Sequence, residues 1–72
     1  MDYGFEGLGK RRTLTGILKG HYGHHLIVEG SGEHWEIETE RPHRRLIGKR
    51  VTVTGWEAGA QRMIVIEMKL AE

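Results

Sequence analysis

The sequence predicts an all-β domain, a barrel of five strands with one short helix between the third and fourth strands. Polar and apolar residues alternate with a period of two over several short segments rich in Val, Ile and Thr, as strands require. The chain has 11 glycines, which fall mainly between those segments, where turns are expected. Pro42 opens a segment that ends at Gly48, and this arrangement favours a short helix.

One small domain accounts for the chain. With 72 residues it is too short for two domains, and we expect a flexible tail at residues 1–11 followed by the barrel at residues 12–72. The absence of cysteine excludes disulfides, thiolate metal sites and a cysteine nucleophile. Stability must therefore come from packing, or from packing together with self-association.

The first strand is expected to begin at Arg12. Leu14 and Leu18 share one parity, and Gly16 lies between them in the strand interior. Glycine inside a strand often marks a bulge or a tight bend. Gly16 therefore predicts a sharp bend of the kind that a barrel corner needs. A turn follows at residues 20–23.

The second and third strands are expected at His25–Glu29 and His34–Thr39. A four-residue turn at residues 30–33 would place the apolar residues of both strands on one face, as a half-buried antiparallel pair requires. The predicted cross-strand pairs are Val28 with Trp35, Ile27 with Glu36, Leu26 with Ile37, and His25 with Glu38.

The remaining elements follow the proline. A helix of roughly one to two turns is expected at Pro42–Ile47. A fourth strand is expected at Arg50–Thr54, a loop at residues 55–60 and a fifth strand at Arg62–Leu70, again from their alternation. In the fifth strand, Ile64, Ile66, Met68 and Leu70 share one parity. Met63 and Val65 are apolar on the other parity, so the start of this strand is expected to be covered on both sides. The predicted core is Leu14, Leu18, Leu26, Val28, Trp35, Ile37, Leu46, Val51, Val53, Ile64, Ile66 and Met68.

This order of elements, with a bent first strand, is the layout of the OB fold, a partly open Greek-key barrel of five strands. Three segments, Leu14–Leu18, Gly30–Ile37 and Leu46–Gly55, resemble small bacterial OB-fold domains of unknown function. The resemblance covers roughly residues 12–70. It implies the barrel architecture and no particular activity, since a fold does not imply a function.

The formal net charge is only +1, but the charges are segregated along the chain. Residues 29–40 carry five glutamates and no lysine or arginine, whereas residues 41–50 carry five basic residues and no acid. A nucleic-acid backbone would be attracted to the second block, because the second and third strands expose glutamates. The alternatives are a solvated helix face or an acidic–basic contact between two copies of the chain. This basic patch is Arg41, Arg44, Arg45, Lys49 and Arg50.

The residues expected to bind a ligand lie at the rims of the barrel. OB folds usually bind across the second and third strands, between the first hairpin loop and the loop that joins the last two strands. Those loops carry Tyr22 and Trp56, which suit stacking on bases. Lys19, Arg12 and Arg62 are expected nearby, where they would neutralise phosphates. Alternatively, the two aromatic side chains close the barrel ends or fill a dimer contact.

Catalysis and metal binding have little support in the sequence. Ser31 lies in a glycine-rich turn, where nothing holds its hydroxyl beside a base. His21, His24 and His25 cluster around the first turn, and the predicted pairing brings Glu38 opposite His25, but the spacing matches no metal motif. We expect no metal, no cofactor and no enzymatic activity.

The sequence therefore predicts a non-enzymatic binding module that takes single-stranded nucleic acid or another oligomeric ligand through the rim aromatics. The alternative is a structural module that pairs with itself as a homodimer or binds a protein partner. No segment approaches the roughly 20 apolar residues of a membrane span, and the N-terminus lacks the pattern of a secretory signal. We accordingly expect no membrane partner and a cytoplasmic location.

Overall fold

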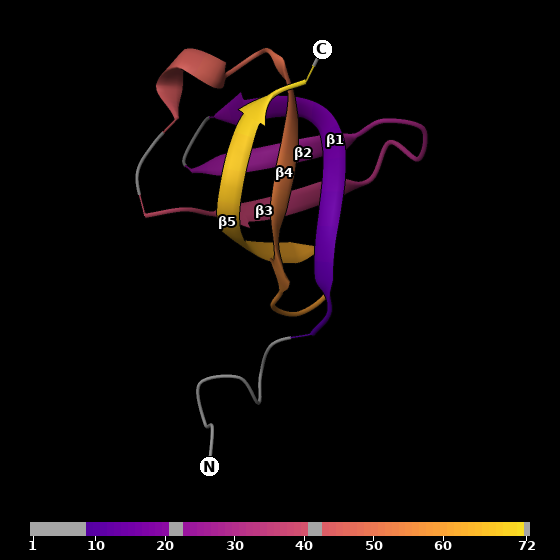
Figure 1. Ribbon diagram of the computed structural model, residues 1–72. Coiled ribbons are helices and arrows are strands. Elements are labelled where there is room, and N and C mark those ends of the chain that lie inside the picture. Colours follow the sequence, from indigo (N-terminus) through magenta and orange to yellow (C-terminus); the bar gives the residue numbers. More distant parts are fainter. Residues whose placement is uncertain (1–8, 21–22, 41–42, 72) are drawn as a thin grey trace.

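The protein is an all-β barrel of five strands in a computed structural model that describes residues 9–20, 23–40 and 43–71 (Figure 1). The barrel closes in the order β1-β2-β3-β5-β4, and β4 returns to β1. Neighbouring strands are antiparallel, except that β3 and β5 are parallel. The elements are β1 (Arg11–Gly20), β2 (His24–Val28), β3 (His34–Glu38), a 3₁₀ turn η2 (Arg44–Leu46), β4 (Arg50–Glu57) and β5 (Arg62–Leu70).

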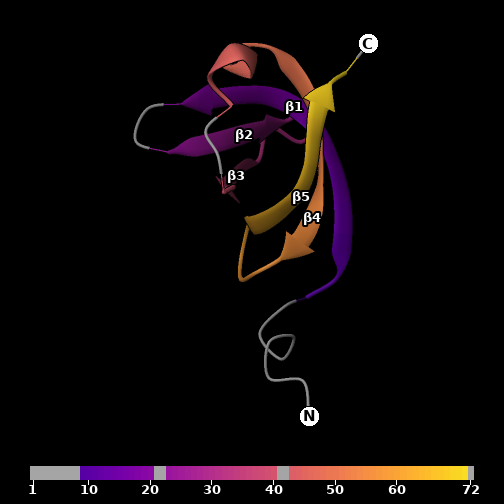
Figure 2. The ribbon, with the colours of Figure 1, turned by 60° about the vertical axis from the view of Figure 1, so that its left-hand side comes forward.

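The predicted bend at Gly16 is confirmed. β1 pairs with β4 from Arg11 to Ile17 and with β2 from Gly16 to Gly20, so Gly16 has a strand on each side. Figure 2 shows β1 curving around the barrel. A Cβ atom at Gly16 would lie 2.1 Å from the carbonyl oxygen of Ile27. Only glycine, which has no Cβ atom, avoids this steric overlap.

The β2–β3 hairpin forms with a register two residues away from the predicted one. Leu26 pairs with Trp35, and His25 pairs with Glu36 and not with Glu38. The turn begins one residue earlier than expected, because the Val28 N–H donates to the carbonyl oxygen of the residue before β3. A slip of two residues leaves every side chain on its predicted face, so the hydrophobic pattern is equally satisfied by both registers.

The loop expected at residues 55–60 begins later than predicted, because β4 continues to Glu57. Gly55 permits this continuation, since a Cβ atom there would lie 2.2 Å from the carbonyl oxygen of Ile64. Trp56 therefore lies within a strand and not in a loop. This placement sets Trp56 beside Arg11 of β1 and Ile64 of β5 and not at the tip of a loop.

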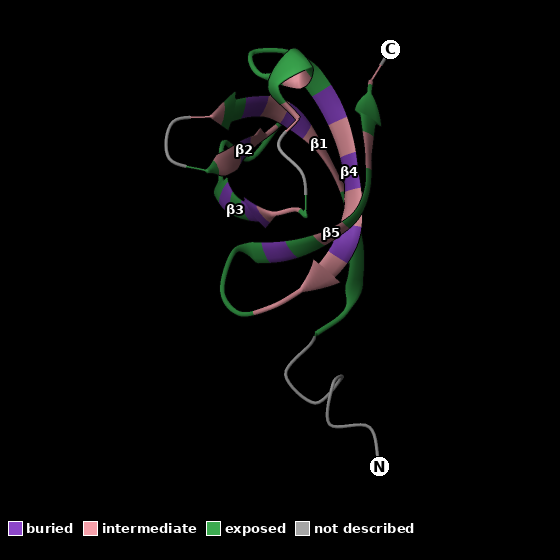
Figure 3. Cartoon of the chain, turned by 90° about the vertical axis from the view of Figure 1, so that its left-hand side faces the viewer, coloured by how far each residue is buried: buried purple, intermediate pink, exposed green. Residues whose placement is uncertain are grey.

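Seven apolar side chains of the described residues are buried in the barrel, and Figure 3 shows buried positions alternating with intermediate or exposed ones along the strands. Leu14, Val28, Leu46 and Met68 are partly buried against this core, in agreement with the prediction. Ile64 and Ile66 are instead 38% and 53% exposed, so their predicted place in the core is wrong. The buried residues are Leu18, Leu26, Trp35, Ile37, Val51, Val53 and Met63.

A β-bulge in β5 explains the difference. Thr54 of β4 pairs with Glu67, but the next residue, Gly55, pairs with Val65, which leaves Ile66 as an extra residue in β5. The alternation of inward and outward side chains changes at such a bulge. Odd-numbered residues of β5 therefore face the core before Ile66, and even-numbered residues face it afterwards.

The predicted helix at Pro42–Ile47 is only a 3₁₀ turn over Arg44–Leu46. Its predicted start at Pro42 lies outside the described residues. Leu46 packs against the core, but the following residue, Ile47, already has an extended backbone with ψ of 131°. A segment this short forms too few hydrogen bonds to offset the free-energy cost of nucleating an α-helix. The packing of Leu46 against the core therefore determines its conformation.

Candidate functional site

Trp56 lies on the outer face of the sheet formed by β1, β4 and β5. Its direct neighbours across the strands are Arg11 and Ile64, and directly paired residues share one face of a sheet. Ile64 is 38% exposed, so this face is the outside of the barrel. Tyr22, the other aromatic residue of the predicted binding rim, lies outside the described residues.

Arg12, one of the residues expected to neutralise phosphates, contacts two side chains of the barrel. Its Nη1 lies 2.7 Å from Glu57 Oε2. Its guanidinium carbon lies 5.4 Å from the centroid of the Trp35 ring, within the range of a cation–π contact. The Trp35 indole N–H in turn donates to Glu33 Oε1 at 3.2 Å. Arg12 therefore covers the edge of the core near Trp35.

Arg62, another expected phosphate ligand, is paired with carboxylates on the outer face of β3. Its Nη2 donates a hydrogen bond to Glu38, and its Nε lies 4.0 Å from Glu36 Oε1. The hydrogen bond from Arg62 to Glu38, followed by their charge attraction, raises the pKa of Arg62. A phosphate would have to compete with these two glutamates for the guanidinium.

Arg50 of the predicted basic patch is paired in the same way. It donates two hydrogen bonds to the carboxylate of Glu29, which follows β2. These bonds are the main reason why the pKa of Glu29 is lowered and that of Arg50 is raised. Together with Arg12 and Arg62, this pairing leaves fewer cations for a ligand than the composition suggests.

Changing Glu29 to Gln is expected to reduce the loss in the free energy of unfolding that occurs as the pH falls below neutrality. Because the pKa of Glu29 is lowered in the folded protein, its stabilisation is complete above the carboxyl pKa of the unfolded chain, about 4.3. It is lost as the pH falls through the lower folded value. Urea unfolding from pH 7 to pH 3 measures this effect, which is small because water and salt screen an exposed pair.

The control for this experiment is Glu67→Gln, which removes an exposed glutamate that has no arginine partner within the described segments. Its pH profile should follow that of the wild type more closely. Superimposable profiles for Glu29→Gln and the wild type would contradict the prediction.

Four other cations gather at one end of the barrel, which we call the basic end: Lys19, Arg44, Arg45 and Lys49. The backbone brings them together, because the Gly48 N–H donates to the Leu18 carbonyl at 2.7 Å and the Leu18 N–H donates to the Lys49 carbonyl at 3.0 Å. All four side chains are exposed. Over residues 9–20, 23–40 and 43–71, no carboxylate pairs with any of them. Arg41 of the predicted basic patch lies outside the described residues.

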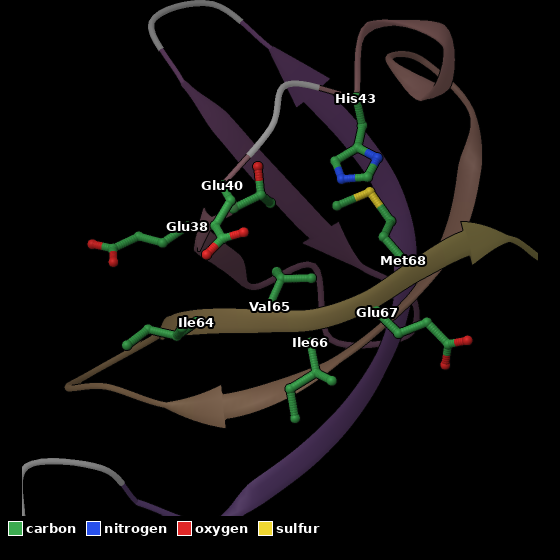
Figure 4. A pocket seen from close by; sticks show the side chains of 9 residues that line it. Glu38, Glu40, His43, Ile64, Val65, Ile66, Glu67 and Met68 are labelled. Atoms are coloured by element: carbon green, nitrogen blue, oxygen red, sulfur yellow. The ribbon is translucent and has the colours of Figure 1, made fainter. Parts of the chain in front are cut away.

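A groove opens in the barrel wall beside β5. The parallel pairing of β3 with β5 stops at Glu38 and Ile64, although β5 continues to Leu70. The resulting hollow of about 430 Å³ lies between β5 and the segment that follows β3 (Figure 4). It is lined by Glu38, Thr39, Glu40, His43, Ile64, Val65, Ile66, Glu67 and Met68.

The side chains of the groove have an ordered arrangement. Figure 4 shows Val65 and Met68 pointing from β5 toward the opposite wall, where Glu40 and His43 lie. The Glu40 side chain reaches toward Val65, whereas Glu38 turns away from the groove. The groove therefore combines an aliphatic and thioether surface with a carboxylate.

His43 is held in the groove wall by a hydrogen bond to β2. Its backbone N–H donates to His24 Nε2 at 2.9 Å, and the two rings lie with centroids 6.4 Å apart. Because Nε2 accepts this bond, His24 carries its proton on Nδ1 when neutral. In the described part of the chain, no cluster of three or more His, Asp or Glu residues has the arrangement of a metal site.

Sequence reasoning placed Lys19, Arg44, Arg45 and Lys49 among the binding residues but did not bring Lys19 together with the other three. It missed the groove entirely. One signal for the groove was present, since the predicted fifth strand, Arg62–Leu70, is longer than the predicted third strand, His34–Thr39. Two paired strands of unequal length must leave one edge without a partner.

Comparison with known proteins gives a family and no activity. The family described as "Protein of unknown function (DUF5818)" matches residues 15–71. No curated protein matches the chain, and no solved structure matches it. Within the described residues, no helix has the length and apolar character needed to cross a membrane.

Proposed function

The chain belongs to the DUF5818 family of unknown function, and from its own surface we propose that it is a non-enzymatic binding module of the OB type. Its ligand is the phosphate backbone of a single-stranded nucleic acid, bound at the basic end. The strand order β1-β2-β3-β5-β4 and the bent first strand support the OB assignment, since the OB fold is a five-stranded Greek-key barrel. Many OB folds bind oligonucleotides.

The observation that carries the proposal is the group of four cations at the basic end. Exposed cations without carboxylate partners attract polyanions, and they release counterions when a phosphate backbone binds. The face on which OB folds usually bind is less suitable here. It exposes Glu36 and Glu38, and its nearest arginine, Arg62, is already paired with them.

Binding should depend steeply on salt. If four phosphates are contacted, the logarithm of the association constant falls with a slope of about −2.8 against the logarithm of the salt concentration. The affinity should then fall about fifty-fold between about 50 and 200 mM salt. Fluorescence anisotropy with a labelled oligothymidylate of about 16 nucleotides measures this dependence.

The double variant Arg44→Gln, Arg45→Gln should bind more weakly and halve the slope to about −1.4. The matched control is Lys10→Gln, Arg11→Gln, which removes two exposed cations near the start of β1 and should leave the slope unchanged. Equal losses in both double variants, or no anisotropy change at high micromolar protein, would contradict the proposal.

A second candidate function, self-association or binding to a protein partner, is favoured by apolar side chains on the outer face of β4 and β5. Ile64 is 38% exposed and Ile66 is 53% exposed, and Trp56 lies directly beside Ile64. Aromatic and aliphatic anchors of this kind are typical of interface centres. Sedimentation velocity at low and high salt distinguishes this function, since apolar association persists at high salt whereas phosphate binding does not.

A further inference from the structure

We propose that the groove beside β5 binds one extended, basic segment of a partner protein, which adds to β5 as a further strand. The occupant is a peptide segment and not nucleic acid, because the Glu40 carboxylate lies in the groove and would repel phosphate, and the described lining residues include no lysine or arginine that would attract it. This inference is independent of the basic end, which uses other residues.

The edge of β5 supplies the backbone partners for such a strand. The Ala71 N–H donates to the Arg50 carbonyl at 2.9 Å, so this backbone position faces β4. Backbone groups of successive residues in a strand point to opposite sides. The N–H and C=O groups of Met68 and Leu70 therefore face away from β4, on the side where the pairing with β3 has ended. Unpaired groups in a row along an edge are a template for an added strand.

The dimensions of the groove favour a single segment. A hollow of about 430 Å³ is in the range of sites that hold a few side chains, and it is too small for a folded domain. If a second copy of this barrel added its own β5 at this edge, β4 of that copy would come with it, because β4 pairs with the other edge of β5. An isolated peptide strand brings no further strand with it. Thr39, Glu40 and His43 form the opposite wall, so the added strand lies between these residues and β5.

The chemistry of the lining favours a lysine or arginine in that segment. Val65 and Met68 form an apolar floor, and the Glu40 side chain points toward Val65 (Figure 4). A long basic side chain packs its alkyl stem on apolar surface and keeps its charge at a carboxylate. Among the described lining residues there is no lysine or arginine to compete for Glu40.

The test uses the full chain and a fluorescent peptide of sequence Lys-Val-Lys-Val-Lys-Val. Three comparison ligands separate the contributions: the same peptide with Glu in place of Lys, the basic peptide with N-methyl groups on alternate backbone nitrogens, and an oligothymidylate. We expect only the unmodified basic peptide to bind in the groove, with slower amide exchange at Met68 and Leu70. N-methylation removes the donors that a strand pair needs while keeping the charge.

The variant Glu40→Gln should weaken peptide binding about three- to five-fold, as the loss of a partly exposed ion pair would. The matched control Glu36→Gln changes an exposed glutamate outside the groove and should have no such effect. Equal binding of the N-methylated or acidic peptide would overturn the proposal, as would oligothymidylate binding that protects Met68 and Leu70. A stable dimer of the free chain that shows the same protection would assign the edge to a second copy.

Discussion

Replacing Gly16 with alanine is expected to unfold the barrel. The added Cβ atom would lie 2.1 Å from the Ile27 carbonyl oxygen and 2.9 Å from the Val28 Cα. Both neighbours belong to the backbone, so no side-chain rotation relieves the overlap. We expect a loss of more than about 4 kcal/mol. A domain of this size has a total stability of about 4 to 11 kcal/mol.

The matched control is Gly32→Ala, the same substitution in the β2–β3 turn. Gly32 has a φ of +73°, and a Cβ atom there would meet no atom within 4 Å. It should therefore cost only about 1 to 2 kcal/mol for the left-handed conformation. Circular dichroism during heating compares the two variants, and a cooperative transition of Gly16→Ala within a few degrees of the wild type would refute the prediction.

Replacing Met63 with alanine is expected to destabilise the protein by about 2 to 5 kcal/mol. Met63 is fully buried, so its truncation leaves a cavity in the barrel. By contrast, Ile66→Ala should change the stability by no more than about 0.5 kcal/mol, because Ile66 is 53% exposed. The sequence pattern alone predicts the opposite order, so this pair of variants tests the bulge in β5.

Met63→Leu completes the comparison, since it conserves volume and should cost less than about 1.5 kcal/mol. Urea unfolding followed by tryptophan fluorescence gives all three free energies of unfolding. A larger loss for Ile66→Ala than for Met63→Ala would mean that β5 faces the core with the even-numbered residues throughout.

The barrel itself could be predicted because its signals are local. The alternation in each strand and the isolated Gly16 depend only on neighbouring residues. The fifth strand was harder, because Met63 and Val65 are apolar on one parity and Ile64 and Ile66 are apolar on the other. The choice between them is made by the bulge, which exists only in the pairing with β4.

The candidate site was harder to predict because its charges depend on register. A two-residue slip in the β2–β3 hairpin moves Glu36 opposite His25. Glu38 instead pairs with Arg62, which removes that arginine from the predicted ligand set. The hydrophobic pattern accepts both registers, so it carries no information about this exchange.

The double pairing of β1 also constrains the order in which the chain folds. Its contacts with β2 are local, but Thr13 meets Thr54 at a separation of 41 positions, and loop closure over such a length slows folding. The meander of β1, β2 and β3 can form before the other edge of β1 has paired with β4. During that interval the long first strand presents an open edge that another chain could occupy. The pairing of β1 with β4 removes this open edge when the barrel closes.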